Sequence, residues 1–509
     1  MLSRVLSCAT IGIDAYIVEV EVDIALGLPT FSTVGLPDAA VKESKDRVKA
    51  AIVNTGFEFP VRRITVNLAP ADIKKEGPIF DLPIAIGIIA AQGLIDEGVL
   101  KDYVILGELS LDGTIRTIKG ALPMAVAARD SGKKGIILPK ENCDEAAVVN
   151  GVKVYPISSL PEAVEFLNGR LELLPVKIDL EKIFENNSRH RTDFTDVKGQ
   201  EHAKRALEVA AAGGHNIIMI GSPGSGKTML AKRLPTILPD MTFEEAIETT
   251  KIHSVVGLLE KSQAMVGTRP FRSPHHTISD AGLIGGGAIP MPGEVSLSHN
   301  GVLFLDELPE FKRNVLEVMR QPLEDGRVTI SRASASLTFP ARFMLAAAMN
   351  PCPCGFKFDT KKECTCSPGQ IHKYHAKISG PLLDRIDIHI EIPALKYKEL
   401  SSDSAGEPSK VIRGRINSAR KVQQERFKGD GIFCNAHMSP KQIKKFCAID
   451  EAGQKLLETA INRFALSARA YDRILKVSRT IADLEETLNI KPEHLSEAIQ
   501  YRSLDRGTG

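Results

Sequence analysis

A run of eight residues, GSPGSGKT, has the composition of a phosphate-binding loop. It matches the pattern GxxxxGK[ST] in full and lies between a short apolar run at 216–220 and the helix-forming MLAKRL, the context that such a loop requires. The glycines let backbone N–H groups surround phosphate oxygens, the lysine brings positive charge to the β- and γ-phosphates, and the threonine hydroxyl can bind Mg²⁺. The alternative is a glycine-rich turn that only resembles such a loop, and the complete motif in this context favours the phosphate-binding loop. The sequence therefore predicts an ATP site with the phosphate-binding residues Gly221, Ser222, Pro223, Gly224, Ser225, Gly226, Lys227 and Thr228.

Two adjacent carboxylates follow a second apolar run, at 301–305. A carboxylate at the carboxyl end of a central strand can hold Mg²⁺ through water, and we expect this of Asp306. The next carboxylate can polarise the attacking water, and we expect this of Glu307. An acidic cap on the following helix is the alternative for an isolated pair. The phosphate-binding loop upstream favours the catalytic interpretation.

Four cysteines form two Cys-x-Cys pairs between 352 and 366. Four thiolates can complete the tetrahedral shell of a structural Zn²⁺, although one-residue spacing within each pair is tighter than usual. His372 or His375 could replace one of them. Free cysteines in a loop and a redox-sensitive patch are the alternatives. The predicted zinc ligands are Cys352, Cys354, Cys364 and Cys366.

The segment at 326–342, GRVTISRASASLTFPAR, contains two β-type runs joined by small residues, which predicts a β-hairpin with Arg332 near its tip. Arg269 and Arg272, together with His275 and His276, form a second polar and basic cluster. The hairpin resembles the pre-sensor-1 hairpin of MCM helicases and magnesium chelatase. This resemblance implies an element that lines the pore of a ring and whose arginines track DNA phosphates, so we expect DNA contacts from Arg332, Arg269 and Arg272. A surface hairpin whose arginines pair with nearby acids is the alternative.

Alternating apolar and helical runs predict an α/β fold that positions these residues on a parallel sheet. Short strands at 64–68, 103–106 and 135–138, with a helix at 121–129, are expected before a charged linker at 171–191. After a loop at 401–409, helical periodicity predicts helices at 411–427, 440–446, 451–464, 471–488 and 492–501.

Composition indicates the number of domains and the cellular compartment. The chain has 509 residues, 43% hydrophobic and 25% charged, as is usual for soluble proteins of two or three domains. A net charge of +2 neither demands nor excludes a nucleic-acid partner. The most apolar run, 83–94, is too short to cross a bilayer, and scattered cysteines suit a reducing compartment. We therefore expect a cytoplasmic protein without a membrane partner.

Three long stretches carry a family resemblance: DVKGQEHAKRAL before the loop, TRPFRSPHHTISDAGLIGGGAIPMPGEVSLSHNGVLFLDELPEF after it, and SARAYDRILKVSRTIADL near the end. Together they resemble the YifB/ComM family of magnesium-chelatase-like AAA+ ATPases, over essentially the whole chain. The resemblance implies an AAA+ core with a hairpin inserted in its second helix, a hairpin before sensor 1 and a helical lid. For the ComM members it implies hexameric helicases that drive DNA branch migration during natural transformation.

The resemblance also implies roles for residues outside the two ATP motifs. Asn350, which ends the apolar run AAAMN, matches sensor 1, and Arg385 in LLDRID matches the arginine finger that reaches a neighbouring subunit's γ-phosphate. A planar, always charged guanidinium can neutralise charge on the transferred phosphoryl group. Arg469 in SARAYDR is the expected sensor 2, with Arg473 and Arg479 as alternatives. A solvated charge on a helix face is the alternative for each arginine.

The N-terminal stretches KKEGPIFDLPIAIGIIAA and LGELSLDGTIRTIKGALPMAVAARDSGKKGIILPKEN resemble the proteolytic domain of Lon, a fold shared with ribosomal protein S5 domain 2. In that protease, the two stretches carry a nucleophilic serine and a lysine. Side by side, they place Ile79 and Leu122 at these positions, and neither side chain can attack a carbonyl or accept a proton. The resemblance implies an α+β domain that acts as a scaffold, an oligomerisation surface or a DNA-facing ring.

We therefore expect a Lon-like domain without its dyad at 1–170, a linker at 171–192, an AAA+ core at 193–395 and a helical lid with sensor 2 at 396–509. The predicted function is ATP- and Mg²⁺-dependent translocation on single-stranded or branched DNA by a homo-hexamer. A metal-insertion motor like the magnesium chelatase ATPase subunit, and an ATP-dependent protease or chaperone, are the alternatives.

Overall fold

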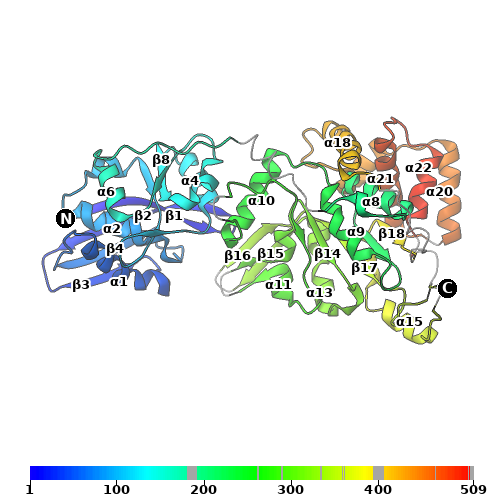
Figure 1. The fold of residues 1–509 in the computed structure, drawn as a ribbon, viewed down its shortest axis with the longest axis horizontal. Coiled ribbons are helices and arrows are strands. Elements are labelled where there is room, and N and C mark those ends of the chain that lie inside the picture. The colour runs from blue at the N-terminus through cyan, green and yellow to red at the C-terminus, as the bar shows by residue number, and fades with distance from the viewer. Residues whose placement is uncertain are drawn as a thin grey trace. The chain divides into compact units, whose positions relative to one another are not determined.

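The structure is a computed structural model that describes residues 1–179, 192–260, 263–287, 290–332, 335–357, 359, 362–393, 406–464, 466–502 and 504. The chain divides into two compact units (Figure 1). Unit 1 comprises Met1–Asn187 and Phe243–Gly267, and unit 2 comprises Ser188–Thr242 and Thr268–Gly509. Residues 180–191 of the predicted linker and residues 401–405 of the predicted loop lie outside the described residues.

Unit 1 is built on a seven-stranded mixed sheet in the order β3-β4-β2-β1-β5-β8-β9. Alternate residues of β2 are buried from Val18 to Ile24, as expected for a strand with one face on the core. The strands are β1 Leu2–Ile11, β2 Asp14–Ala25, β3 Thr30–Val34, β4 Arg63–Ala69, β5 Tyr103–Ile105, β8 Gly135–Pro139 and β9 Lys153–Ile157. The three strands predicted here are confirmed, as is the helix at 121–129, which is α4 (Ala121–Asp130).

The most apolar run of the chain is a core helix of unit 1. All eleven residues of α2 (Asp81–Ala91) are buried, and the helix packs on β1 and β2. The other helices of this unit include α1 (Ala39–Asn54), α5 (Cys143–Ala147) and α6 (Leu160–Leu167). Over the described residues, no helix combines the length and the apolar character that a membrane crossing needs.

A helix from the middle of the chain completes unit 1. In α10 (Phe243–Val256), the Ser254 hydroxyl donates to the buried Glu145 carboxylate, and Lys251 Nζ lies 3.0 Å from Asp14 Oδ1. The Gly120 N–H donates to the Ser254 carbonyl over 3.1 Å. Burial raises the pKa of Glu145, and the hydrogen bond from Ser254 opposes this shift. These partners come from distant parts of the chain, and the pair Ser254–Glu145 alone spans 109 residues.

Unit 2 contains a five-stranded, fully parallel sheet in the order β11-β14-β17-β10-β18. Its strands are β10 Ile217–Ile220, β11 Phe271–Arg272, β14 Val302–Leu305, β17 Met344–Met349 and β18 Ile388–Glu391. Because all five strands run the same way, their carboxyl ends meet at one edge, where ligands of open α/β sheets bind. The α/β class with a parallel sheet is thus confirmed.

Two hairpins lie side by side in unit 2. The predicted one pairs β15 (Arg327–Arg332) with β16 (Ala335–Pro340), antiparallel, with Arg332 opposite Ala335. A shorter one pairs β12 (Gly285–Gly286) with β13 (Met291–Pro292). A Cβ placed on Gly285 would lie 2.7 Å from Ile330 Cδ1, so the two hairpins are in direct contact.

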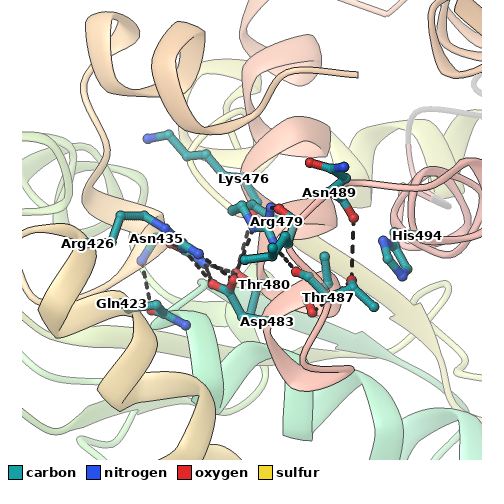
Figure 2. A network of polar contacts seen from close by, with 12 residues as sticks. Gln423, Arg426, Asn435, Lys476, Arg479, Thr480, Asp483, Thr487, Asn489 and His494 are labelled. Carbon is teal, nitrogen blue, oxygen red and sulfur yellow. Dashed lines mark hydrogen bonds and ion pairs between the residues drawn. The ribbon is translucent and has the colours of Figure 1, made fainter. Parts of the chain in front are cut away.

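The C-terminal helices pack against this core as one hydrophobic cluster. They are α18 Ser409–Arg426, α19 Pro440–Phe446, α20 Glu451–Phe464, α21 Ala468–Leu484 and α22 Pro492–Gln500. The helix predicted at 471–488 begins earlier because Ser467 caps it, and it ends earlier because Glu486 has a positive φ of 54°. A buried carboxylate holds the bundle together: Asp483 accepts hydrogen bonds from Arg426, Asn435 and Arg479 at 2.6–3.1 Å (Figure 2).

Candidate nucleotide site

The phosphate-binding loop joins β10 to α9 (Lys227–Arg233) at the carboxyl edge of the parallel sheet. The side chain of Lys227 is turned into the loop, where its Nζ donates to the carbonyls of Gly221 and Ser222 at 2.7 and 3.0 Å. Lys227 is only 8% exposed. Burial lowers the pKa of this lysine, and the negative charges of Asp306 and Glu307 oppose the shift. The ammonium group therefore lies beside the loop carbonyls. When ATP binds, it can donate its hydrogen bonds to phosphate oxygens in their place.

Two hard oxygen ligands meet beside the loop. Thr228, at the start of α9, donates its hydroxyl to Asp306 Oδ2 over 2.6 Å, although the two residues are 78 positions apart. Asp306 directly follows β14, so both groups come from the carboxyl ends of parallel strands. Hydroxyl and carboxylate oxygens are the protein ligands that Mg²⁺ prefers.

The loop itself has room for phosphate. A Cβ added to Gly224 would meet no atom within 4 Å, and Gly224 and Gly226 have positive φ values of 78° and 93°. The hydroxyl of Ser225 is buried without a hydrogen-bond partner among the described residues. An open, glycine-shaped loop with an unsatisfied hydroxyl fits a polyphosphate, so the residues present suit Mg²⁺-bound ATP.

Glu307 is held in an unusual backbone conformation beside a histidine. Its φ is +53°, and its N–H donates to Asp306 Oδ1 over 3.0 Å. Its Oε2 lies 3.5 Å from His276 Nδ1, and the His276 ring lies against that of His275, with centroids 4.1 Å apart. The sequence placed His276 in a basic cluster for DNA, whereas the structure puts it next to the predicted water-polarising carboxylate.

Asn350 connects the sheet edge to the loop lysine. It follows β17, between the strands that carry the other two motifs, and its Oδ1 accepts from Lys227 Nζ over 3.3 Å. Tyr374 hydrogen bonds to the backbone of Asn350, and burial raises the pKa of this tyrosine to about 12. The P-loop cluster, which we define as Lys227, Thr228, Asp306, Glu307 and Asn350, is therefore assembled within one chain.

Gln200 is a site residue that the sequence reasoning missed. Its Nε2 donates to the Ser225 carbonyl over 2.7 Å, and a Cβ on Gly226 would lie 3.7 Å from its amide. It stands just before α8 (Glu201–Gly213) with a φ of +56°. In the sequence, Gln200 is marked only by the glycine before it and the helical run after it. Neither feature indicates its contact with Ser225, which lies 25 residues further along the chain.

Arg385 belongs to a second group, away from the P-loop cluster in the contacts of the described residues. It follows α16 (Gly380–Leu383), is 7% exposed, and donates to the Pro381 carbonyl over 2.6 Å. Its other terminal nitrogen pairs with Glu324 of α14 (Arg320–Asp325). This hydrogen bond and the charge of Arg385 hold the pKa of Glu324 below its usual range. Both residues line a hollow of about 510 Å³ between α14 and β15.

The three candidates for sensor 2 occupy different surroundings. Arg469 is exposed and lies 3.7 Å from Asp384, next to Arg385 in the chain, so it joins this second group. Arg473 pairs with the buried Asp387, which also contacts His215 at 3.2 Å. Arg479 is buried and donates to Asp483 and to the carbonyls of Thr487 and Leu488. Figure 2 shows Arg479 beside Asp483 and Thr487, within the network of the C-terminal helices. We call Arg385, Glu324 and Arg469 the arginine cluster.

The predicted DNA contacts are also separated by the structure. Arg332 ends β15 and is exposed, and its Nη2 lies 3.4 Å from where a Cβ on Gly286 of the neighbouring hairpin would be. Arg269 donates to the carbonyls of Pro239 and Asn300 at 2.6 and 2.7 Å. Arg272 makes a two-pronged pair with Glu294 at 2.6 and 2.7 Å. Of the three arginines, Arg332 is the exposed one, and it stands at the end of a hairpin strand.

The four predicted zinc ligands are brought together. Their Sγ atoms all lie within 4.8 Å of one another, and three of the Sγ–Sγ distances are 3.3, 3.7 and 3.6 Å. Sulfur atoms around a tetrahedral Zn²⁺, with Zn–S bonds of about 2.3 Å, lie about 3.8 Å apart. The backbone N–H of Cys354 donates to the Sγ of Cys366 over 3.3 Å, as in many thiolate sites. His375 instead contacts the Pro351 carbonyl.

In unit 1, the two positions of the protease dyad are apolar and enclosed. Ile79 is 7% exposed, in a short turn before α2, and Leu122 is fully buried in α4. The Leu122 N–H donates to Glu145 over 2.8 Å. Neither position presents a nucleophile or a base.

Comparison with known proteins places this geometry in a family context. Three family models match the chain: "Magnesium chelatase, subunit ChlI" at 193–400, "Subunit ChlI of Mg-chelatase" at 20–142, and the ChlI C-terminal model at 406–502. Competence protein ComM of Haemophilus influenzae is 47% identical, over 99% of this chain and 98% of that protein. YifB of Escherichia coli is 45% identical over the same shares. Lon protease 2 of Bacillus subtilis is 32% identical over 28% of this chain and 26% of that protein.

Proposed function

The chain belongs to the ComM and YifB family of magnesium-chelatase-like ATPases, and from that premise we propose that it is an ATP-driven DNA translocase. In this proposal it acts in the cytoplasm as a hexameric ring that moves branch points during recombination of DNA taken up in transformation. The observation that carries the proposal is the β15–β16 hairpin, which holds Arg332 exposed beside a second hairpin. A ring of such arginines would track the phosphates of a strand without reading its bases.

The hairpin is linked in the chain to the arginine cluster. Glu324 pairs with Arg385, and β15 starts at Arg327, only three residues later. When Arg385 leaves Glu324 for a neighbouring subunit's γ-phosphate, the ion pair that holds α14 at the base of the hairpin is broken. Hydrolysis would therefore be transmitted to the DNA-tracking element. Bound ATP supplies the phosphoryl group whose transfer to water releases the free energy, while Lys227 grips it and Glu307 orients the water.

The proposal is tested by Arg332→Ala, with Arg327→Ala as the matched control at the other end of the same strand. Both arginines are exposed, and each variant removes one positive charge. We expect Arg332→Ala to keep its basal ATPase rate but to bind branched DNA more weakly. The salt dependence of binding should become shallower by about 0.7–0.9 in log–log slope for each DNA phosphate that the variant no longer neutralises. Branch migration should fall further than binding, because the hairpin transmits each step.

The readout is migration of a synthetic four-way junction by each variant. If Arg332→Ala moves junctions as fast as the parent protein and as Arg327→Ala, the hairpin is not the DNA-tracking element. Arg269 and Arg272 would then be replaced in turn. Because Arg269 bonds to backbone carbonyls and Arg272 pairs with Glu294, the stability of each variant would be measured beside its DNA binding.

The family models favour a second candidate, a motor for metal insertion like the magnesium chelatase ATPase subunit. The two functions are separated by what stimulates ATP hydrolysis. Stimulation by single-stranded or branched DNA supports the translocase, whereas stimulation only by a chelatase partner protein supports the metal-insertion motor. A protease function has no chemical support, because apolar side chains stand at positions 79 and 122. Casein hydrolysis with ATP would reverse that conclusion.

Zinc is the proposed second metal of the protein, beside the Mg²⁺ that accompanies ATP. The four clustered cysteines could supply all four ligands of a zinc ion. Such a closed shell is typical of structural zinc and leaves no open position for catalysis. We expect about one zinc per chain by elemental analysis. We expect it to be lost when Cys352 and Cys364 are both replaced by serine.

A further inference from the structure

The cysteine loop, residues 351–367, approaches the phosphate-binding loop closely at one point. Gly355, next to Cys354, lies against the ring of Pro223. A Cβ added to Gly355 would lie only 2.6 Å from Pro223 Cδ and 2.7 Å from its Cγ, and a proline ring has little freedom to move away. Gly355 also has a φ of +84°, which disfavours any other residue. At this point the phosphate-binding loop leaves no room for a side chain on residue 355.

The cysteine loop is also fixed to Asn350. Cys352 is two residues beyond Asn350, whose side chain accepts from Lys227. The helix α15 (Pro368–His375) begins two residues after Cys366 and returns to the same strand end, where His375 Nε2 donates to the Pro351 carbonyl over 3.0 Å. Tyr374 of the same helix bonds to the Asn350 backbone. Both ends of the loop thus converge on the residue that contacts the loop lysine.

A metal is the group that would make this connection rigid. The cysteines are free thiols in close contact, so no covalent bond joins Cys352 and Cys354 to Cys364 and Cys366. A metal bound by all four would join the first pair of cysteines to the second. Gly355 and Asn350 would then be held at fixed places beside the phosphates.

We infer that metal at the cysteine cluster braces the ATP site, so that nucleotide affinity depends on an ion that never touches the nucleotide. The inference rests on the proposed zinc site and adds a role to it. It makes Gly355 a positioning residue that acts through Pro223. It also makes the cluster a point at which loss of zinc would weaken ATP binding.

The experiment measures zinc content and the affinity for a fluorescent ATP analogue on the same full-length protein. Zinc is removed with 1,10-phenanthroline, which leaves Mg²⁺ in place, and is then added back. We expect removal to weaken nucleotide binding by about tenfold or more, equivalent to about 1.4 kcal/mol, and we expect added zinc to restore it.

A substitution that keeps all four thiols separates the brace from the metal itself. Gly355→Ala should retain zinc yet weaken nucleotide binding by a similar factor, since its methyl group must displace Pro223. Gly369→Ala is the matched control, because a Cβ there meets no atom within 4 Å. It should change neither zinc content nor affinity. Thermal unfolding of each variant identifies a protein that has failed to fold.

The outcomes are distinct. Zinc that can be removed without a change in nucleotide affinity would overturn the brace and leave the zinc site standing. Parent protein that contains no metal would overturn both, while leaving the DNA translocase proposal untouched. Normal affinity in Gly355→Ala would show that the contact with Pro223 carries no constraint, which also contradicts the inference.

Discussion

The P-loop cluster and the arginine cluster differ in how complete they are within one chain. In the first, Lys227, Thr228, Asp306 and Asn350 are joined by hydrogen bonds from three parallel strand ends. In the second, Arg385 is occupied by an acidic partner, and among the described residues no contact joins it to the phosphate-binding loop. The P-loop cluster is therefore joined by contacts within one chain, whereas Arg385 would have to leave Glu324 before it could contact a phosphate. This is the arrangement expected if Arg385 serves the nucleotide of a neighbouring subunit.

The largest effect on ATP binding and turnover should come from a substitution in the P-loop cluster. Lys227→Ala removes the only lysine in the phosphate-binding loop, so we expect loss of nucleotide binding and, with it, loss of turnover. Isothermal titration with ATP measures the binding. Lys232→Ala, an exposed lysine of the same helix, should bind normally. Normal ATP affinity in Lys227→Ala would mean that the loop is not the phosphate site.

Arg385→Ala should affect turnover and leave binding nearly unchanged, because the arginine lies outside the P-loop cluster. A comparable arginine in GTPases contributes roughly 10³–10⁵ in rate, so even a partial equivalent is easily measured by steady-state ATPase. Arg320→Ala, in the same hollow but paired with Glu317, is the control.

Mixing Arg385→Ala with Lys227→Ala protein sharpens the comparison. If the two clusters meet across subunit interfaces, some interfaces in mixed rings contain two intact halves, and turnover should recover in part. A mixture as inactive as either variant alone would count against action across an interface.

Glu307→Gln should keep ATP binding and slow hydrolysis by about 10²–10⁴, the usual contribution of a general base. ATP should then accumulate on the protein, which a filter-binding assay with labelled nucleotide detects. Glu310→Gln, three residues further on and paired with Lys377 at 3.4 Å, should hydrolyse normally. Normal turnover in Glu307→Gln would remove this residue from the mechanism.

The smallest effect is expected from Glu324→Gln, which releases Arg385 from its partner. Ion pairs with an exposed member contribute little, so we expect turnover to rise by less than about fivefold. Glu317→Gln, which lines the same hollow without touching Arg385, should leave the rate unchanged. A large fall in turnover with Glu324→Gln would instead mean that Glu324 orients the arginine for catalysis.

The P-loop cluster could be predicted from the sequence because its motifs are contiguous and each follows an apolar strand. The helices α19 and α20 match the predicted ranges residue for residue, since capping and hydrophobic periodicity are local. Contacts between distant segments were not predictable. The pairing of Glu324 with Arg385 spans 61 residues, and that of Ser254 with Glu145 spans 109. No local pattern indicates that α10 packs on unit 1, or that His276 lies beside Glu307.

Glu307 combines a strained backbone with its predicted role of polarising the attacking water. Its left-handed backbone costs a residue with a side chain roughly 1–2 kcal/mol, and glycine or asparagine would relieve most of that cost. The chain nevertheless keeps a carboxylate at the position. A library randomised at 307 and sorted for stability alone should therefore accumulate glycine and asparagine. The same library sorted for ATP turnover should return glutamate, so the residue frequencies under the two selections measure what the carboxylate is worth to the enzyme.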